Sequence, residues 1–163
     1  MAQDYRHNQR KQPKVSAEQQ VVEAIAKGIW AVVSFPFKMG KKGKLQKKAG
    51  LVPAGVAQEL GQHWEVVSLY SQTPNTYAVA ISEADKLLDN ALKAANVAGA
   101  TMGERLKASQ HVFDPYLYNL IWDAHKLRNR LAHEVGTSVN GQEVQQALHA
   151  FEQGLLRLGV FIH

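Results

Sequence analysis

Apolar side chains recur every three or four residues from Pro53 onward, and this spacing limits the folds open to the chain more than any other feature. The first stripe is Val56, Leu60, Trp64, Val67 and Tyr70, and the last is Val144, Leu148, Phe151, Leu155 and Leu158. Such spacing places the apolar residues on one face of an α-helix. Because no run of the sequence alternates as a half-buried strand would, we predict an all-α fold.

Sequence signals for the start of a helix divide this region into segments. Each signal consists of a capping side chain that is followed either by Glu three residues later or by proline at the first helical position. The signals are Thr73-Pro74, Thr101 with Glu104, Asp114-Pro115 and Asn140 with Glu143. We expect helices over about 56–72, 75–97, 101–110, 115–134 and from 140 onward. Short loops join them, so residues 54–163 are predicted to form an up-and-down bundle of four to five helices.

The charge is unevenly distributed along the chain. Residues 1–50 hold 11 Lys and Arg against 3 Asp and Glu, a net charge of +8, whereas residues 51–163 carry a net charge of −3. A basic segment favours an anionic partner, either RNA or a membrane surface. That expectation applies to the N-terminal arm alone, since the acidic body is a poor general surface for RNA.

The arm itself has three parts. Residues 1–15 are polar and predict a disordered basic tail, residues 16–37 predict a hydrophobic, amphipathic helix, and residues 38–53 form a Lys/Gly-rich linker. The linker lysines are Lys38, Lys41, Lys42, Lys44, Lys47 and Lys48. The apolar run is short for a spanning helix and is interrupted by Glu23 and Lys27, which disfavours a transmembrane segment.

Two interpretations of the 16–37 helix stay open. Its apolar stripe either packs on the bundle or on a second subunit, or lies in a membrane interface while the lysines contact anionic headgroups. A third role for the lysines is contact with RNA phosphates, because charge alone does not separate the two kinds of phosphate. We expect a cytoplasmic protein, which would be peripheral to the membrane if this helix binds lipid.

Cysteine is absent from the chain. That excludes a disulfide scaffold, a thiolate zinc site and a Cys nucleophile, and it fits a reducing compartment. The sequence also lacks a glycine-rich phosphate loop and a dinucleotide fingerprint. We predict no cofactor and no metal site.

The residues that can carry chemistry cluster between Trp122 and Glu134. His125, Asn129 and His133 follow one another at four-residue spacing and so share a helix face, with Arg128 on its flank. Imidazole exchanges protons near neutral pH, and guanidinium binds two phosphate oxygens at once. Together these groups suit phosphodiester cleavage without a metal.

A purely structural interpretation of the same residues is also open. Arg128 or Arg130 can pair with a carboxylate on a neighbouring helix, and Asp85 is a candidate because it falls on the apolar side of its own helix. We expect His125 to be a partly buried histidine beside Trp122.

The run Arg128-Asn129 followed by His133 resembles the signature of the HEPN superfamily: Arg, four to six residues, then His, with a polar residue, often Asn, after the Arg. The resemblance covers residues 54–163. It implies a helical bundle that dimerises and places the Arg/His motifs of both subunits in one cleft. It further implies a metal-independent endoribonuclease in which the RNA 2′-hydroxyl attacks the adjacent phosphate.

The resemblance also implies residue roles. His133 would be the acid/base, Arg128 would bind the phosphate, and Asn129 would orient His133 or the phosphate. Glu83 and Asp85 lie where some members supply an acidic group near the Arg. The chain has Val135 where one toxin branch has Tyr, so it departs from that branch. Because other members are inactive binding modules, the second hypothesis is a non-catalytic interaction module, peripheral to the membrane through the arm.

Overall fold

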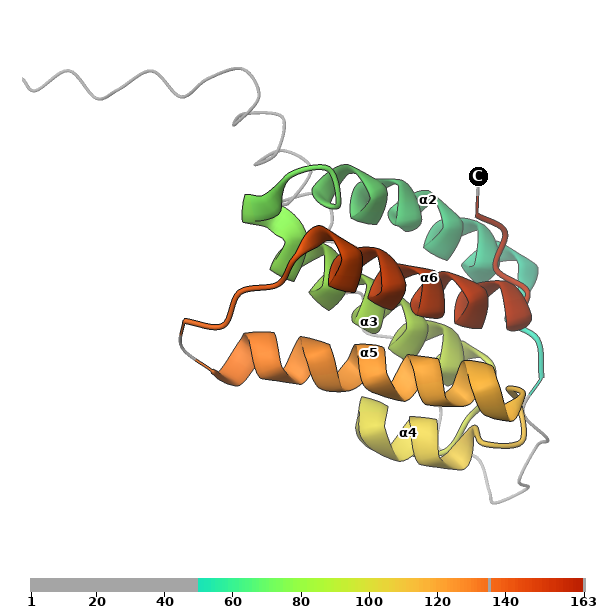
Figure 1. The fold of residues 1–163 in the computed structure, drawn as a ribbon. Helices are drawn as coiled ribbons and strands as arrows, with labels where there is room; N and C mark the ends of the chain where they lie inside the picture. The colour runs from blue at the N-terminus through green and yellow to red at the C-terminus, as the bar shows by residue number, and fades with distance from the viewer. Residues whose placement is uncertain (1–49, 135, 163) are drawn as a thin grey trace, which may run out of the picture. The chain divides into compact units, whose positions relative to one another are not determined.

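The computed structural model describes residues 50–134 and 136–162, and this part of the chain is all-helical, as predicted. Its elements are α2 (Ala54–Tyr70), the 3₁₀-helix η1 (Pro74–Thr76), α3 (Tyr77–Ala94), α4 (Met102–Ala108), α5 (Pro115–His133) and α6 (Gly141–Arg157). Figure 1 shows that the long helices α2, α3, α5 and α6 run alternately in opposite directions, with the short α4 in the connection between α3 and α5. The predicted up-and-down bundle is therefore confirmed in the described residues.

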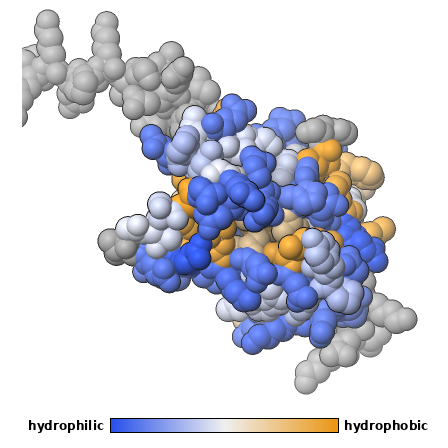
Figure 2. All heavy atoms as spheres, in the orientation of Figure 1, coloured by the Kyte–Doolittle hydropathy of each residue, from blue (hydrophilic) through white to orange (hydrophobic). Residues whose placement is uncertain are grey.

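Helix α3 is the centre of this bundle and contacts α2, α4, α5 and α6. Its apolar face is fully buried at Ile81, Leu88 and Leu92, and the predicted stripe of α6 is buried along its whole length. Removing one such Leu or Ile side chain from water contributes about 1.5–3 kcal/mol. The face shown in Figure 2 has the opposite character: it is mostly hydrophilic, with apolar side chains interspersed.

Close approach of the helices depends on Gly154 in the middle of α6. A Cβ atom added there would lie 3.0 Å from Ile121 Cδ1 of α5 and 3.2 Å from Leu88 Cδ1 of α3. These separations are tight for carbon atoms in a packed interior. The missing side chain therefore lets α6 settle between α3 and α5.

Two of the predicted helix starts are confirmed in full. Asn140 and Glu143 form a capping box, with each side chain accepting a hydrogen bond of 3.0 Å from the other's backbone N–H. The Asp114 carboxylate accepts from the backbone N–H groups of Tyr116 and Leu117, both at 3.0 Å. These bonds satisfy N–H groups that the first turn of a helix leaves without a partner.

The predicted start at Thr73-Pro74 is wrong for α3. The proline opens η1 instead, and the Thr73 hydroxyl pairs with the Thr76 hydroxyl at 2.7 Å rather than with a backbone N–H. Helix α3 then begins at Tyr77. At Thr101 half of the predicted box forms: Thr101 accepts from Glu104 N, but the Glu104 carboxylate accepts from Ala100 N.

Residues 50–53, the end of the predicted linker, are attached to the bundle. Val52 is buried in the core, its N–H donates to Leu158 O at 2.9 Å, and Gly50 N donates to Ala95 O at 3.1 Å. Val52 is the apolar residue of this segment that reaches the core, whereas its neighbours Leu51 and Pro53 are exposed. The predicted tail 1–15, the helix 16–37 and the six linker lysines lie outside the described residues. None of the described helices is long and apolar enough to cross a membrane.

Candidate functional site

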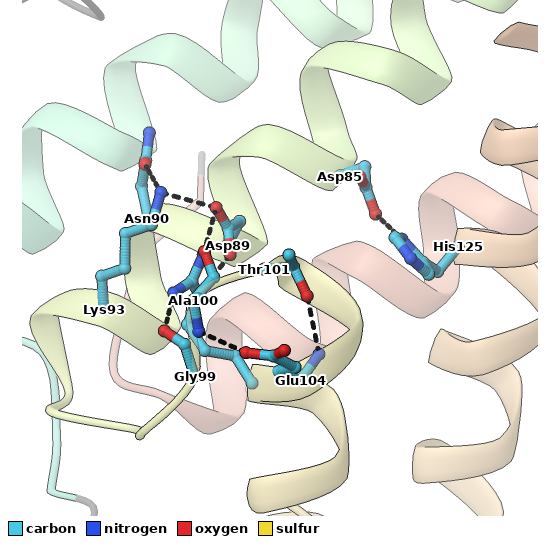
Figure 3. Close-up of polar contacts among 10 residues, drawn as sticks. Asp85, Asp89, Asn90, Lys93, Gly99, Ala100, Thr101, Glu104 and His125 are labelled. Atoms are coloured by element: carbon cyan, nitrogen blue, oxygen red, sulfur yellow. Dashed lines mark hydrogen bonds and ion pairs between the residues drawn. The ribbon is translucent and has the colours of Figure 1, made fainter.

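The candidate site lies where α3, α4 and α5 meet. Helix α3 brings Asp85 and Asp89 to one side because residues four apart stand one above the other on a helix. Helix α5 turns its apolar residues Ile121 and Ala124 into the core and places His125 beside α3. Figure 3 shows the Asp85 carboxylate pointing at the His125 ring, with the Asp89 cluster further along α3.

The buried pair Asp85–His125 is the centre of the site. Asp85 is 3% exposed and His125 is 8% exposed, and the distance from His125 Nδ1 to Asp85 Oδ1 is 2.7 Å. The His125 ring also packs edge-on against Trp122, with centroids 5.9 Å apart, as the sequence predicted. A carboxylate buried this deeply needs such a partner, since burial without one costs several kcal/mol.

Two further side chains close this pair into a ring. Asn129 Nδ2 lies 3.2 Å from His125 Nε2, and Arg128 Nη1 donates to Asn129 Oδ1 at 3.0 Å. Arg128 Nε then lies 3.6 Å from Asp85 Oδ2, which makes it an ion pair. We call these four residues, Asp85, His125, Asn129 and Arg128, the polar ring.

The polar ring has a single hydrogen-bond direction. An amide nitrogen only donates, so His125 Nε2 accepts from Asn129 and Nδ1 is the protonated nitrogen that donates to Asp85. Arg128 donates in turn to the amide oxygen of Asn129. Each member thereby fixes the orientation of the next, and a neutral His125 satisfies every bond.

Arg128, like Asn129, is a partly exposed member of the ring, whereas Asp85 and His125 are buried. The Arg128 side chain is 29% exposed, and its guanidinium makes one hydrogen bond within the described residues, to Asn129. Its Nε is buried without a hydrogen-bond acceptor. The remaining Nη groups are therefore available to a ligand, while attraction to Asp85 holds the guanidinium in place.

A second polar cluster fixes α4 to α3. Buried Arg105 donates from Nε to Asp89 Oδ1 at 2.5 Å and also to the backbone oxygen of Gly99, while Lys93 lies 2.6 Å from Asp89 Oδ2. Burial by itself would raise the pKa of Asp89, but the hydrogen bonds from Arg105 and Lys93 outweigh it and lower the pKa below its ordinary value of 3.8. Asp89 is therefore ionised at neutral pH.

Between the two clusters is a pocket of about 400 Å³. The polar ring, Lys86 and Asp89 form its walls on α3 and α5, and Thr101, Met102 and Gly103 form its wall at the start of α4. Its size lies within the ~300–1,000 Å³ range of small-molecule sites.

The structure brings together only part of the predicted site. Arg128, Asn129, Asp85 and His125 meet in the polar ring, and the predicted pairing of Asp85 with an Arg is confirmed. His133 lies in the last turn of α5, is exposed, and does not line the pocket. Arg130 pairs with Glu143 at 3.3 Å, and Glu83 pairs with Lys86 at 2.6 Å.

Sequence reasoning missed Asp89, Arg105 and the α4 wall of the pocket. Asp89 had a usable signal, because it repeats Asp85 at four-residue spacing on a mainly apolar helix. Gly103 and Met102 gave none, since their role depends on how α4 packs.

Within the described residues, no three His, Asp or Glu side chains gather closely enough to hold a metal ion. Comparison of the chain with protein-family models, with curated proteins and with solved structures finds no match.

Proposed function

We propose that this protein is a HEPN-like endoribonuclease that cleaves RNA as a homodimer without a metal ion. The observation that supports the proposal most is that α5 presents two kinds of functional side chain, fixed ones and an exposed one. The polar ring holds Arg128 and Asn129 in fixed orientations, while His133 stays exposed one helical turn beyond Asn129. A phosphate-binding group needs to be fixed, and a proton-transfer group needs to reach its substrate.

The proposed reaction is an internal transesterification. The 2′-oxygen of one nucleotide attacks the adjacent phosphorus, the bond from phosphorus to the 5′-oxygen breaks, and a 2′,3′-cyclic phosphate and a 5′-hydroxyl are formed. A neutral His133 takes the proton of the 2′-hydroxyl, and a protonated His133 gives one to the leaving 5′-oxygen. In a homodimer the two copies of His133 supply both forms.

Arg128 would stabilise the charge that develops on the phosphate oxygens. Its guanidinium is already oriented by Asn129 and Asp85, so little reorganisation is needed when the transition state forms. The same tethering leaves the outer Nη groups free for a two-point contact with phosphate.

The ion pair between Arg128 and buried Asp85 also favours a second candidate, a non-catalytic HEPN-like interaction module. In that case the ring is structural, and the function lies with the arm: the helix at 16–37 and the lysines from Lys38 to Lys48 would hold a cytoplasmic protein at anionic lipid. Sedimentation with anionic liposomes, weakened by added salt, is the expected sign of this module.

The deciding experiment is RNA cleavage by the purified full chain in EDTA. We expect the wild type to cleave and His133→Ala to lose cleavage, because the proton-transfer group is gone. His149→Ala is the matched control: His149 is also a helical, exposed histidine, with 64% of its side chain accessible, and it should cleave like the wild type.

The outcomes separate the two candidates. Cleavage that survives in His133→Ala contradicts the proposed role of that histidine. A wild type that is folded and dimeric but does not cleave any RNA supports the interaction module, and the liposome assay then becomes the next test.

A further inference from the structure

Charged side chains of both signs line the pocket beside the polar ring. Two carboxylates line it, Asp85 and Asp89, and two cations, Lys86 and Arg128. The two carboxylates oppose the entry of a phosphate dianion, so the pocket itself favours a neutral polar group, whereas the partly exposed Arg128 can contact a phosphate at the pocket mouth.

The lining offers both donors and acceptors at short range from one another. The Nη groups of Arg128 donate, and so does the Thr101 hydroxyl, whose oxygen already accepts from Glu104 N at 3.2 Å. Asp85 and Asp89 contribute carboxylate oxygens, which already accept from His125 and Arg105, and each oxygen can accept two hydrogen bonds. Met102 supplies an apolar surface. A flat heterocycle with donors and acceptors on its edge satisfies such a lining, and a purely apolar molecule does not.

Gly103 keeps this space open. A Cβ atom at Gly103 would lie 3.9 Å from His125 Nε2 and 3.9 Å from Trp122 Cη2. A longer side chain would therefore extend from α4 toward α5 and into the pocket. The absence of a side chain at residue 103 thus creates room next to the polar ring.

We infer that this pocket binds a nucleobase of the RNA substrate, namely the base next to the phosphate that Arg128 contacts. The inference rests on the proposed function for the identity of the substrate, and on the lining of the pocket for the part of the nucleotide that enters it. One consequence is base preference: the enzyme cleaves faster where a base that matches these donors and acceptors stands beside the broken bond.

The test follows backbone amide signals of the ¹⁵N-labelled full chain during titration with adenosine, guanosine, cytidine and uridine, and separately with inorganic phosphate. At least one nucleoside should shift the signals of Met102 and Gly103. Phosphate should shift signals near Arg128 and Asn129 and leave the α4 wall unchanged.

Two glycine variants provide the matched comparison. Gly103→Leu should weaken nucleoside binding by about tenfold or more and should abolish any base preference in RNA cleavage, because the leucine fills the pocket. Gly55→Leu is the control, since Gly55 is likewise the second residue of its helix but has no atom within 4 Å of an added Cβ. Circular dichroism verifies that both variants fold.

The readouts distinguish failure of this inference from failure of the proposed function. Nucleoside binding at Met102 and Gly103 without RNA cleavage upholds the pocket and overturns the ribonuclease. Cleavage with a base preference that Gly103→Leu leaves intact, or shifts at the α4 wall caused by phosphate but by no nucleoside, overturns the base pocket. The absence of any nucleoside shift at millimolar concentration overturns it as well.

Discussion

Asp85 shows at the scale of a single residue how this fold accommodates a charge on the apolar side of a central helix. Its carboxylate is almost fully buried, and it has a hydrogen bond from His125 and an ion pair with Arg128. Removal of one partner from such a set is costly, because the others lose their acceptor while they stay buried.

We therefore expect Asp85→Ala to lower the free energy of unfolding by about 2–3 kcal/mol, since the His125 Nδ1–H and the Arg128 guanidinium lose their carboxylate. Urea denaturation of the full chain measures this change. Asp123→Ala is the control: Asp123 pairs with Lys126 at 3.1 Å with both side chains about 70% exposed, and such surface pairs contribute little. Equal stability of the two variants would contradict a stabilising role for the ring.

Asp89 makes stability depend on pH in the acid range. The pKa of its carboxyl is lowered in the folded chain, so the unfolded chain binds a proton more readily. Its contribution is therefore complete above its ordinary pKa of 3.8 and is lost as pH falls through the lower folded value.

Denaturation of the wild type and Asp89→Asn from neutral pH down to pH ~2 tests this linkage. The stability difference between the two should be constant near neutral pH and should shrink below about pH 4, because protonated Asp89 resembles the amide. A difference that grows as pH falls would contradict a lowered pKa.

The partners of Asp85 could be predicted only in part from the sequence. An Asp between apolar positions on a helix is unfavourable without a partner, and that alone predicted a cationic or hydrogen-bonding neighbour for Asp85. Its main partner, His125, is 40 residues away, and only the packing of α5 against α3 selects it. The sequence pattern predicted an Arg partner for Asp85, which Arg128 confirms, but it did not predict that His125 would make the hydrogen bond.

At the scale of elements, α2 is held against the end of the chain by a glycine. A Cβ atom at Gly61 would overlap the backbone oxygen of Phe161. The segment after α6 therefore lies directly on the α2 backbone, and this seating buries Val160. No side chain can be added at residue 61 without moving backbone, which cannot rotate away as a side chain would.

Gly61→Ala should therefore destabilise the protein by about 1–3 kcal/mol, as overpacking does in other cores. Gly55→Ala, in the first turn of the same helix, should be neutral or slightly stabilising, because it meets no neighbour and alanine is the better helix former. Thermal unfolding of both variants checks the contrast. A Gly61→Ala protein as stable as Gly55→Ala would mean that the last segment is loosely seated.

The observed helix starts agree with the predicted ones where a side chain caps the helix. They differ where the backbone geometry determines which kind of helix forms. Asp114 and Asn140 cap their helices as predicted, through local bonds that need no tertiary partner. Pro74 fixes a backbone angle that suits an α-helix and a 3₁₀-helix alike, so the proline could not tell which of the two would follow. The start of α3 at Tyr77 is the result.

For the whole molecule, the proposed ribonuclease function and the separation of charge between arm and body together predict that the arm supplies most of the attraction to RNA. Positive charge binds phosphate by releasing counterions, and the affinity then falls as salt rises. Replacement of the six lysines from Lys38 to Lys48 by serine should weaken RNA binding and flatten its salt dependence. Fluorescence anisotropy across a salt series measures both, with Lys86, Lys93 and Lys107 of the body unchanged; an unaltered slope would exclude the arm as the RNA contact.

The pocket belongs to this largest scale too, and the sequence could not predict it. It exists because Arg105 and Asp89 fix the short α4 against α3, and because residue 103 has no side chain. The four-residue spacing of Asp85 and Asp89 does not indicate which helix packs against them, and a single glycine gives no periodic signal. The motif at Arg128 and Asn129 indicated where chemistry could lie, whereas the shape beside it depends on three helices at once.

The attachment of residues 50–52 has a mechanical consequence. Two backbone hydrogen bonds attach this segment to the bundle. Gly50 N donates to the oxygen of Ala95, just after α3, and Val52 N donates to the oxygen of Leu158, just after α6. Tension applied to the chain ahead of Gly50 therefore loads these bonds and the buried Val52 before it can peel α2 from α3. Since Ala95 and Leu158 follow the C-terminal ends of α3 and α6, which run in the same direction, a pull on the chain ahead of Gly50 is shared between these two helix ends at one end of the bundle instead of being concentrated on the first helix.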